Sequence, residues 1–338
     1  MKSWYKILNS TVDKNRTKVL WNQFLCNYTT FKIGGKAECF VITNSDEEIK
    51  KIIKFAKTYG VLLWVIGNGS NLLISDQGIN GITLKLGNNY SYIKQIGNTL
   101  MIGASTPLSQ IVKCAYLSCL SGVEFLWGIP GTFGGAIVSN AGAFSHDIGE
   151  RVISISGITP NGEALILNRS ELKFQYRKSE LPSDFIITKG IIELTPSDKK
   201  VIKNRMDSYF RIRKARQPRG ASAGSVFKNP QISDFRMQEK PLTKSTKIVL
   251  NNSISAGKLI DELNLKGLKC GGAFVSQKHG NFIINQGGAK FYDVYELIQI
   301  IKCKIEQYTG IVLQEEIQIL PKVLDIAKWR KYNKTKEN

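Results

Sequence analysis

The 338-residue chain has little of what metal sites, membrane spans and secretion signals require. It contains two histidines, His146 and His279, and no Cys-x-x-Cys pair, so we expect no bound metal. Its longest apolar run, residues 61–66, has the length of a strand, and residues 1–8 lack the apolar core of a signal peptide. We therefore expect a cytoplasmic protein with no membrane partner. We also expect reduced and mostly buried thiols at the cysteines, which are Cys26, Cys39, Cys114, Cys119, Cys270 and Cys303.

Acidic residues are scarce relative to basic ones, since 27 Asp and Glu face 47 Lys and Arg and the net charge is +20. This excess is compatible with a nucleic-acid partner, with steering of anionic small molecules, or with a lysine-rich composition that has no specific role. A nucleic-acid surface combines clustered basic residues with exposed aromatic rings. The aromatic residues here lie largely within apolar patterns, so we expect no nucleic-acid partner.

The hydrophobic pattern predicts an α+β protein. Apolar residues recur at helical spacing, and Ser45 and Glu48 fit a capping box at the start of the first such stretch. We expect helices over residues 46–59, from Pro107 to Gly122, and over 200–216, 256–263 and 293–308. We expect strands over residues 61–66, which reads as buried, 225–228, 281–285 and 311–320, with further β-structure over 152–194. Residues 1–25 show no clear pattern, and residues 128–142 are too rich in glycine for a helix or a regular strand.

Two glycine-rich segments are candidates for holding a phosphate. The segment Gly67-Asn68-Gly69-Ser70-Asn71-Leu72 follows a predicted strand, and its glycines allow backbone N–H groups to approach an anion. An ordinary turn uses the same residue types. The segment from Gly128 to Gly142 places four glycines within eight residues around Pro130, which favours close passage of the backbone along a pyrophosphate. It is not the G-x-G-x-x-G motif of a dinucleotide-binding βαβ unit.

Three further side chains are candidates for chemistry. Arg177 could clamp a carboxylate with two hydrogen bonds, although surface arginines are common. Ser225 lies among small and apolar residues, and the sequence shows no His-plus-acid partner for a hydrolase triad. A serine hydroxyl is a sensible proton donor only to a very strong base such as a carbanion. Strand alternation places Glu316 on a polar face with Gln314 and Gln318, which is either a cleft or solvent.

The order of these motifs resembles that of the UDP-N-acetylenolpyruvoylglucosamine reductases, over roughly residues 20–320. The segments that carry the resemblance are Thr30–Gly35, Gly67–Leu72, Gly128–Gly142, Tyr176–Ser179, Gly224–Pro230, Ala256–Ile260 and Leu313–Glu316. The polar stretch near residues 233–253 is longer than the usual link of the family. The segment 177–218 is short, so the chain is similar to the subgroup without the lid loop that carries a tyrosine.

The resemblance implies a vanillyl-alcohol-oxidase-type FAD-binding module of two α+β subdomains, followed by a C-terminal α+β substrate-binding domain. The implied divisions are a basic extension (1–20), the first subdomain (21–85), the second subdomain (86–198), the substrate domain (199–322) with its last strand returning to the active site, and a basic tail (323–338). The FAD would be non-covalent, with its pyrophosphate on residues 67–72 and 131–136. The implied cofactor-binding residues are Gly67, Asn68, Gly69, Ser70, Asn71, Leu72, Gly131, Thr132, Gly134, Gly135, Ala136, Asn140 and Gly142.

The resemblance also implies a reaction. NADPH would reduce the flavin and leave, and the UDP-sugar would then enter the same cleft to have its enolpyruvyl group reduced. Arg177 would stabilise the enolate, Glu316 would assist, and Ser225 would deliver the proton. The implied substrate-binding residues are Tyr176, Arg216 and Asn229, and we expect a monomer. The alternative is a different FAD-dependent oxidoreductase on the same module, which would share the glycine loops but not these three catalytic residues.

Overall fold

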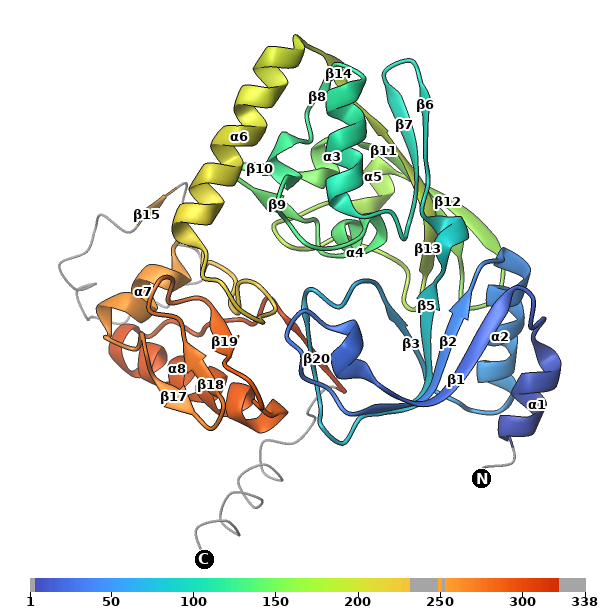
Figure 1. Cartoon of the computed structure of the whole chain (residues 1–338), viewed down its shortest axis with the longest axis horizontal. Coiled ribbons are helices and arrows are strands. Elements are labelled where there is room, and N and C mark those ends of the chain that lie inside the picture. The colour runs from blue at the N-terminus through green and yellow to red at the C-terminus, as the bar shows by residue number, and fades with distance from the viewer. Residues whose placement is uncertain (1–3, 232–248, 251–252, 322–338) are drawn as a thin grey trace, which may run out of the picture.

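The computed structural model describes residues 4–231, 249–250 and 253–321. The basic tail and most of the polar stretch near residues 233–253 lie outside the described residues. The chain forms three units, an N-terminal unit, a second unit and a C-terminal unit (Figure 1), and residues of all three line one cleft. The mixture of helices and sheets agrees with the predicted α+β class.

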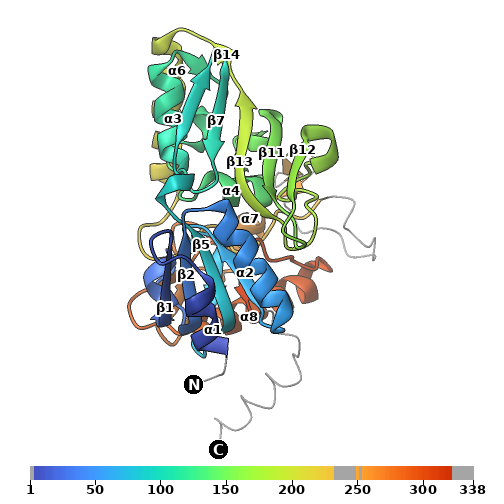
Figure 2. The same ribbon diagram turned by 90° about the vertical axis from the view of Figure 1, so that its right-hand side faces the viewer.

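The N-terminal unit is a four-stranded sheet in the order β1-β2-β5-β3. Strand β1 pairs antiparallel with β2, whereas β2 and β3 pair parallel with β5. Figure 2 shows helix α2 lying over this sheet. The apolar stripe of the helix, which includes Ile49 and Ile52, is buried in one core with Ile82 and Leu84 of the sheet. The elements are α1 (Trp4–Thr11), β1 (Thr17–Phe24), β2 (Lys36–Thr43), α2 (Asp46–Thr58), β3 (Leu63–Ile66), β4 (Leu72–Ile74) and β5 (Ile79–Leu86).

Two expectations for this unit and one for the whole chain are wrong. Residues 4–20 are not an extension, because Leu8 of α1 is fully buried and β1 is part of the sheet. Strand β3 is not buried, because it lies at the edge of the sheet, where Val65 is 48% exposed. The cysteines are not mostly buried: Cys39 is buried, but Cys119 and Cys303 are exposed.

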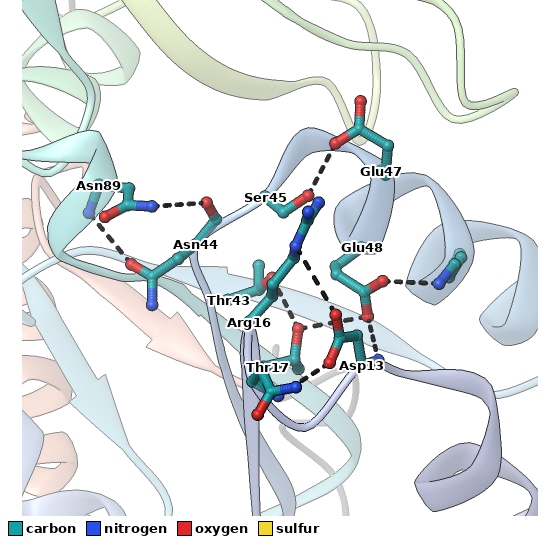
Figure 3. A network of polar contacts seen from close by, with 11 residues as sticks. Asp13, Arg16, Thr17, Thr43, Asn44, Ser45, Glu47, Glu48 and Asn89 are labelled. Atoms are coloured by element: carbon teal, nitrogen blue, oxygen red, sulfur yellow. Dashed lines mark hydrogen bonds and ion pairs between the residues drawn. The ribbon is translucent and has the colours of Figure 1, made fainter.

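The predicted capping box at α2 is also wrong, and Figure 3 shows what replaces it. The hydroxyl of Ser45 donates to the side chain of Glu47 at 2.7 Å and caps no backbone N–H. The carboxylate of Glu48 is buried and accepts from the backbone N–H of Asp13 and from the ammonium of Lys51, both at 2.7 Å. Glu48 therefore ties the turn before β1 to the start of α2.

Replacing Glu48 with alanine is expected to lower the free energy of unfolding by about 1–3 kcal/mol, because the N–H of Asp13 loses its acceptor in a buried site. Urea unfolding of the purified protein measures this loss. Glu47→Ala is the matched control, since Glu47 is the exposed neighbouring acid. Equal effects of the two substitutions would show that the buried network contributes nothing beyond the charge of the helix terminus.

The second unit is an antiparallel five-stranded sheet in the order β12-β11-β13-β7-β6. The β-like pattern over residues 152–194 predicted three of these strands, β11, β12 and β13. Helix α3 buries Leu108, Ile111, Val112 and Ala115, and Cys119 lies beyond its end. The main elements are β6 (Ile93–Ile96), β7 (Thr99–Gly103), α3 (Leu108–Leu117), α4 (Phe133–Val138), β9 (Gly142–Ala143), β10 (His146–Asp147), β11 (Val152–Ile158), β12 (Ala164–Asn168), α5 (Arg169–Leu172) and β13 (Ile186–Glu193), with β8 (Leu120–Ser121) pairing with β14 (Thr195–Pro196).

The second glycine segment contains a short helix, α4, where none was predicted. The hydroxyl of Thr132 accepts from the N–H of Gly135 and caps the helix at its start. Phe133 is fully buried against Gly190, where an added Cβ would lie 2.7 Å from the Phe133 ring. Tertiary packing of Phe133 therefore overrides the low helix propensity of the two glycines that follow it.

The C-terminal unit is built around helix α8, whose apolar face (Val294, Leu297, Ile298, Ile301 and Ile305) is completely buried. The predicted strand over 225–228 is not a regular strand, and of the predicted strand over 311–320 only residues 318–320 are regular. A single bridge joins Phe227 and Glu315. The elements are α6 (Lys199–Arg216), β15 (Val249–Leu250), β16 (Ser253–Ile254), α7 (Ala256–Glu262), β17 (Lys269–Cys270), β18 (Ala273–Val275), β19 (Ile283–Asn285), α8 (Phe291–Thr309) and β20 (Gln318–Leu320).

Two connections join the units. Helix α6 runs along the second unit and buries Ile202 and Met206 in its core, so residues after 199 do not pack only with the C-terminal unit (Figure 1). Strand β20 returns to the N-terminal unit and pairs parallel with β4. No helix within the described ranges has the length and apolarity to cross a membrane. The same residues contain no group of three His, Cys, Asp or Glu side chains placed to hold a metal ion.

Candidate active site

A cleft of about 590 Å³ lies where the three units meet. The first glycine loop (residues 67–72) and the second (residues 128–136) form part of its wall, together with the C-terminal end of α6. Arg177, Ser225 and Glu316 also line it. The structure therefore brings the three predicted catalytic residues and both glycine loops into one cavity.

The first glycine loop presents free backbone donors. Gly69 has a positive φ of 61°, and a Cβ there would lie 2.1 Å from the carbonyl oxygen of Tyr28, so only glycine fits. Among the described residues, no acceptor receives the N–H groups of Asn68, Gly69 and Ser70. Adjacent unsatisfied N–H groups on a turning backbone form the kind of concavity that binds phosphate.

The two loops touch each other. A Cβ at Gly67 would lie 2.8 Å from the hydroxyl oxygen of Thr132, and one at Gly131 would lie 3.3 Å from the hydroxyl oxygen of Ser70. Small residues at these positions keep the two segments in contact, so they form one continuous rim. Gly135, Ala136 and Gly142 also line the cleft. An elongated anion such as a dinucleotide diphosphate fits a rim built this way.

Two predicted cofactor-binding residues, Asn140 and Gly134, do not face the cleft. Asn140 is buried, and its amide donates to the carbonyl of Gln175 at 2.9 Å and accepts from the N–H of Gly149 at 3.0 Å. The N–H of Gly134 donates to Ala104. Their roles in the structure are therefore to hold the backbone behind the cleft.

Asn71 links the first loop to the last strand. Its side-chain amide donates to the backbone carbonyl of Glu316 at 3.0 Å, and its own carbonyl accepts from the N–H of Gln318 at 2.9 Å. The side-chain donor of Asn71 is thus used within the protein. Through this contact, the loop that presents free N–H groups also fixes the backbone from which the Glu316 side chain extends.

Arg177 and Glu316 form an ion pair in the cleft. The Nε of Arg177 donates to Oε1 of Glu316 at 2.6 Å, and its Nη2 donates to the carbonyl of Gly142 at 2.9 Å. The two side chains are only 20% and 19% exposed. Burial raises the pKa of the Glu316 carboxyl, and the charge and hydrogen bond of Arg177 oppose this rise. The pair presents a fixed, partly desolvated guanidinium to anything bound beside it.

Ser225 lies next to this pair. Val226, the residue after it, accepts at its carbonyl a hydrogen bond from the N–H of Glu316 at 2.7 Å. The Ser225 hydroxyl lines the cleft and has no hydrogen-bond partner among the described residues. It is therefore available to a bound molecule, and no base within the described ranges activates it as a nucleophile.

Arg213 is a cleft residue that the sequence did not single out. Its Nη2 donates to the carbonyl of Phe125 at 2.8 Å, its guanidinium lies 5.2 Å from the Phe144 ring centroid, and its buried Nε has no partner among the described residues. Burial, with a smaller contribution from the charge of Arg177, lowers the pKa of Arg213 to about 10. The predicted helix over residues 200–216 contains this residue, but periodicity alone could not show which of its cations faces inward.

The predicted substrate-binding residues are only partly in the cleft. Arg216 lines it, whereas Tyr176 and Asn229 lie behind it. The ring of Tyr176 lies under the Arg177 guanidinium at 5.0 Å, and its hydroxyl accepts from the N–H of Asn229 at 3.3 Å. The side-chain oxygen of Asn229 accepts from the N–H of Ala256 at 3.1 Å, at the start of α7.

Residues 37–168 match the family model described as an FAD binding domain. Together with the fold and the free N–H groups of the glycine loops, this match defines a flavin-binding class of protein. Residues 216–320 match the model described as the C-terminal domain of UDP-N-acetylenolpyruvoylglucosamine reductase. The chain belongs to the UDP-N-acetylenolpyruvoylglucosamine reductase family. This membership and the predicted fold class are thereby confirmed.

Relatives along nearly the whole chain support this assignment. The UDP-N-acetylenolpyruvoylglucosamine reductase of Caldanaerobacter subterraneus subsp. tengcongensis is 36% identical over 305 residues, which are 90% of this chain and 94% of that protein. The reductase of Bacillus subtilis is 35% identical over 318 residues, covering 93% and 98%. The crystal structure of the Thermus caldophilus reductase superimposes with a TM-score of 0.74 at 33% identity, covering 90% of this chain and 99% of that one.

Proposed function

We propose that this protein reduces the enolpyruvyl group of UDP-N-acetylglucosamine enolpyruvate to give UDP-N-acetylmuramate, a step of peptidoglycan precursor synthesis, with NADPH as the reductant and FAD as a non-covalent cofactor. The observation that carries the proposal is the Arg177–Glu316 pair beside the free Ser225 hydroxyl, in a cleft rimmed by the glycine loops. A different FAD-dependent oxidoreductase would need the glycine loops to bind the cofactor, but its reaction would not require Arg177, Glu316 and Ser225.

The residues of the cleft suit a dinucleotide cofactor. The free N–H groups of Asn68, Gly69 and Ser70 would hold its diphosphate, with Gly131 and Thr132 on the opposite side of the rim. When bound, the flavin would take two electrons from NADPH and supply them to the substrate as a hydride. Asn140 and Gly134 would contribute only by shaping the backbone.

The three catalytic residues act on the carbon that carries the substrate carboxylate. Addition of hydride at the terminal vinyl carbon leaves the electron pair of the former double bond on this carbon and in its carboxylate. Arg177 would stabilise that charge as it develops, and Glu316 would hold the guanidinium in place. The Ser225 hydroxyl would then donate its proton to the carbon, which completes the saturated ether, and would recover a proton from solvent.

Cations on the α6 side of the cleft would attract the diphosphate of the UDP-sugar. Arg216 and Arg213 both line that side, and the net charge of +20 would favour the approach of anionic substrates. We expect the enzyme to act as a monomer in the cytoplasm, where NADPH and nucleotide sugars are available.

The purified protein is expected to be yellow and to release FAD on heating or acid treatment. It should oxidise NADPH when the enolpyruvyl sugar nucleotide is added, with UDP-N-acetylmuramate detected by mass spectrometry. A protein that is colourless and cannot be reconstituted with FAD would refute the proposal. A protein that binds FAD but is not reoxidised by this substrate would favour the alternative oxidoreductase.

A further inference from the structure

Lys85 lies behind the first glycine loop. It is near the end of β5 and directly opposite Ile66, the last residue of β3. The first glycine loop begins at the next residue, Gly67. Its ammonium donates to the carbonyl oxygen of Gly67 at 2.7 Å and lies 3.4 Å from the side-chain oxygen of Asn68. Both acceptors are neutral. Lys85 is not among the residues that line the cleft, so it reaches a ligand only through the loop.

The cation of Lys85 has no counter-charge among the described residues. Its strand neighbours are Ile42 of β2 and Ile66 of β3, and no carboxylate of the described ranges pairs with it. Burial lowers the pKa of its ammonium, and no charged group in the described part of the chain opposes that effect. A partly buried cation with only neutral partners is costly. Its position therefore favours a ligand that brings negative charge to the loop.

The peptide between Gly67 and Asn68 connects Lys85 to the cleft. The carbonyl of Gly67 and the N–H of Asn68 belong to one planar trans unit and point in opposite directions. The ammonium therefore fixes the orientation of a peptide whose N–H is one of the free donors of the rim. By drawing electron density toward the oxygen, it also makes that N–H a stronger donor.

We infer that Lys85 is a positioning residue for the cofactor diphosphate: it orients and polarises the Gly67–Asn68 peptide, and the bound diphosphate supplies the counter-charge that Lys85 lacks. This inference rests on the proposed use of FAD. It assigns a function to a lysine outside every motif, on a strand that forms no part of the cleft wall.

The arrangement couples cofactor binding to a proton. Without ligand, burial lowers the pKa of Lys85, and a bound diphosphate favours its charged form and raises that pKa. Binding therefore takes up a proton at a pH between the two values. Affinity for FAD is expected to be constant below the lowered pKa and to fall as the pH rises through it.

The test is titration of the flavin-free protein with FAD, followed by flavin fluorescence, from about pH 7 to about pH 10. Lys85→Met is expected to raise the Kd at neutral pH roughly ten- to a hundredfold and to abolish the alkaline fall in affinity. Lys85→Gln keeps a neutral donor to Gly67, so it should recover part of the affinity but none of the pH dependence. Riboflavin, which lacks the diphosphate, should bind wild type and both variants alike. Lys54→Met is the control, because Lys54 is an exposed lysine of the same unit.

Each outcome decides the inference. If both Lys85 variants bind FAD with the affinity and pH profile of wild type, Lys85 has no such role. If a variant weakens FAD and riboflavin equally, Lys85 is structural. If the wild-type protein itself binds no FAD, the proposed function fails, which is a separate result. Thermal unfolding of the flavin-free variants identifies any that fail to fold, and the inference then depends on Lys85→Gln.

Discussion

Replacement of Ser225 by alanine is expected to leave flavin reduction by NADPH close to its normal rate. Reoxidation by the enolpyruvyl substrate should slow by roughly a hundred- to ten-thousand-fold, the usual contribution of a positioned proton donor. The separation follows because the hydroxyl has no structural partner among the described residues and lines the cleft beside Glu316. Stopped-flow absorbance of the flavin measures each half of the reaction by itself.

Ser225→Cys provides the control for this result. A thiol is also a proton donor, although it is larger, so this variant should recover part of the lost rate. If Ser225→Ala slows reduction and reoxidation equally, the serine is not the proton donor. It would then be a residue that positions the flavin or shapes the loop around Gly224, whose φ is 80°.

Arg177→Lys is expected to slow reoxidation by roughly a hundred- to a thousandfold with little effect on reduction by NADPH. The guanidinium bonds Glu316 through Nε and Gly142 through Nη2, and its remaining N–H groups can meet a substrate carboxylate. An ammonium has the charge but cannot hold these directions at the same time. Stopped-flow measurement with varied substrate separates the loss in rate from any loss in binding.

Lys178→Met is the matched control for Arg177→Lys, since Lys178 is the exposed neighbouring cation. It should change neither half of the reaction. A similar loss in both variants would mean that only the general positive charge of this segment matters. An unchanged reoxidation rate in Arg177→Lys would remove Arg177 from the chemistry.

Elements with a long and one-sided apolar pattern could be predicted from the sequence. Helix α2 was expected over residues 46–59 and spans Asp46–Thr58, and α8 was expected over 293–308 and spans Phe291–Thr309. Burial of one face determines such helices locally. Elements that depend on distant partners could not be found in the same way. Helix α4 forms because Phe133 packs against Gly190, which lies 57 residues further along the chain.

The site shows the same division. Motif order indicated which residues are chemical candidates, but the contacts that organise them join distant segments. Arg177 and Glu316 are 139 residues apart, and Asn71 and Glu316 are 245 apart. No local pattern predicts that the amide of Asn71 holds a backbone carbonyl, or that Asn140 faces away from the cleft. These outcomes depend on how the three units dock.

The pairing of β20 with β4 has a consequence for the synthesis of the protein on the ribosome. Leu72–Ile74 leave the ribosome early, whereas Gln318–Leu320 are almost the last described residues to be made. At usual elongation rates the delay is on the order of tens of seconds. During this delay, β20 is not yet present beside the first glycine loop, and the side-chain amide of Asn71 lacks its acceptor, the backbone carbonyl of Glu316. Cofactor loading by a complete site therefore requires that the chain has been made through residue 320, and a chain that stops before residue 318 leaves the site incomplete.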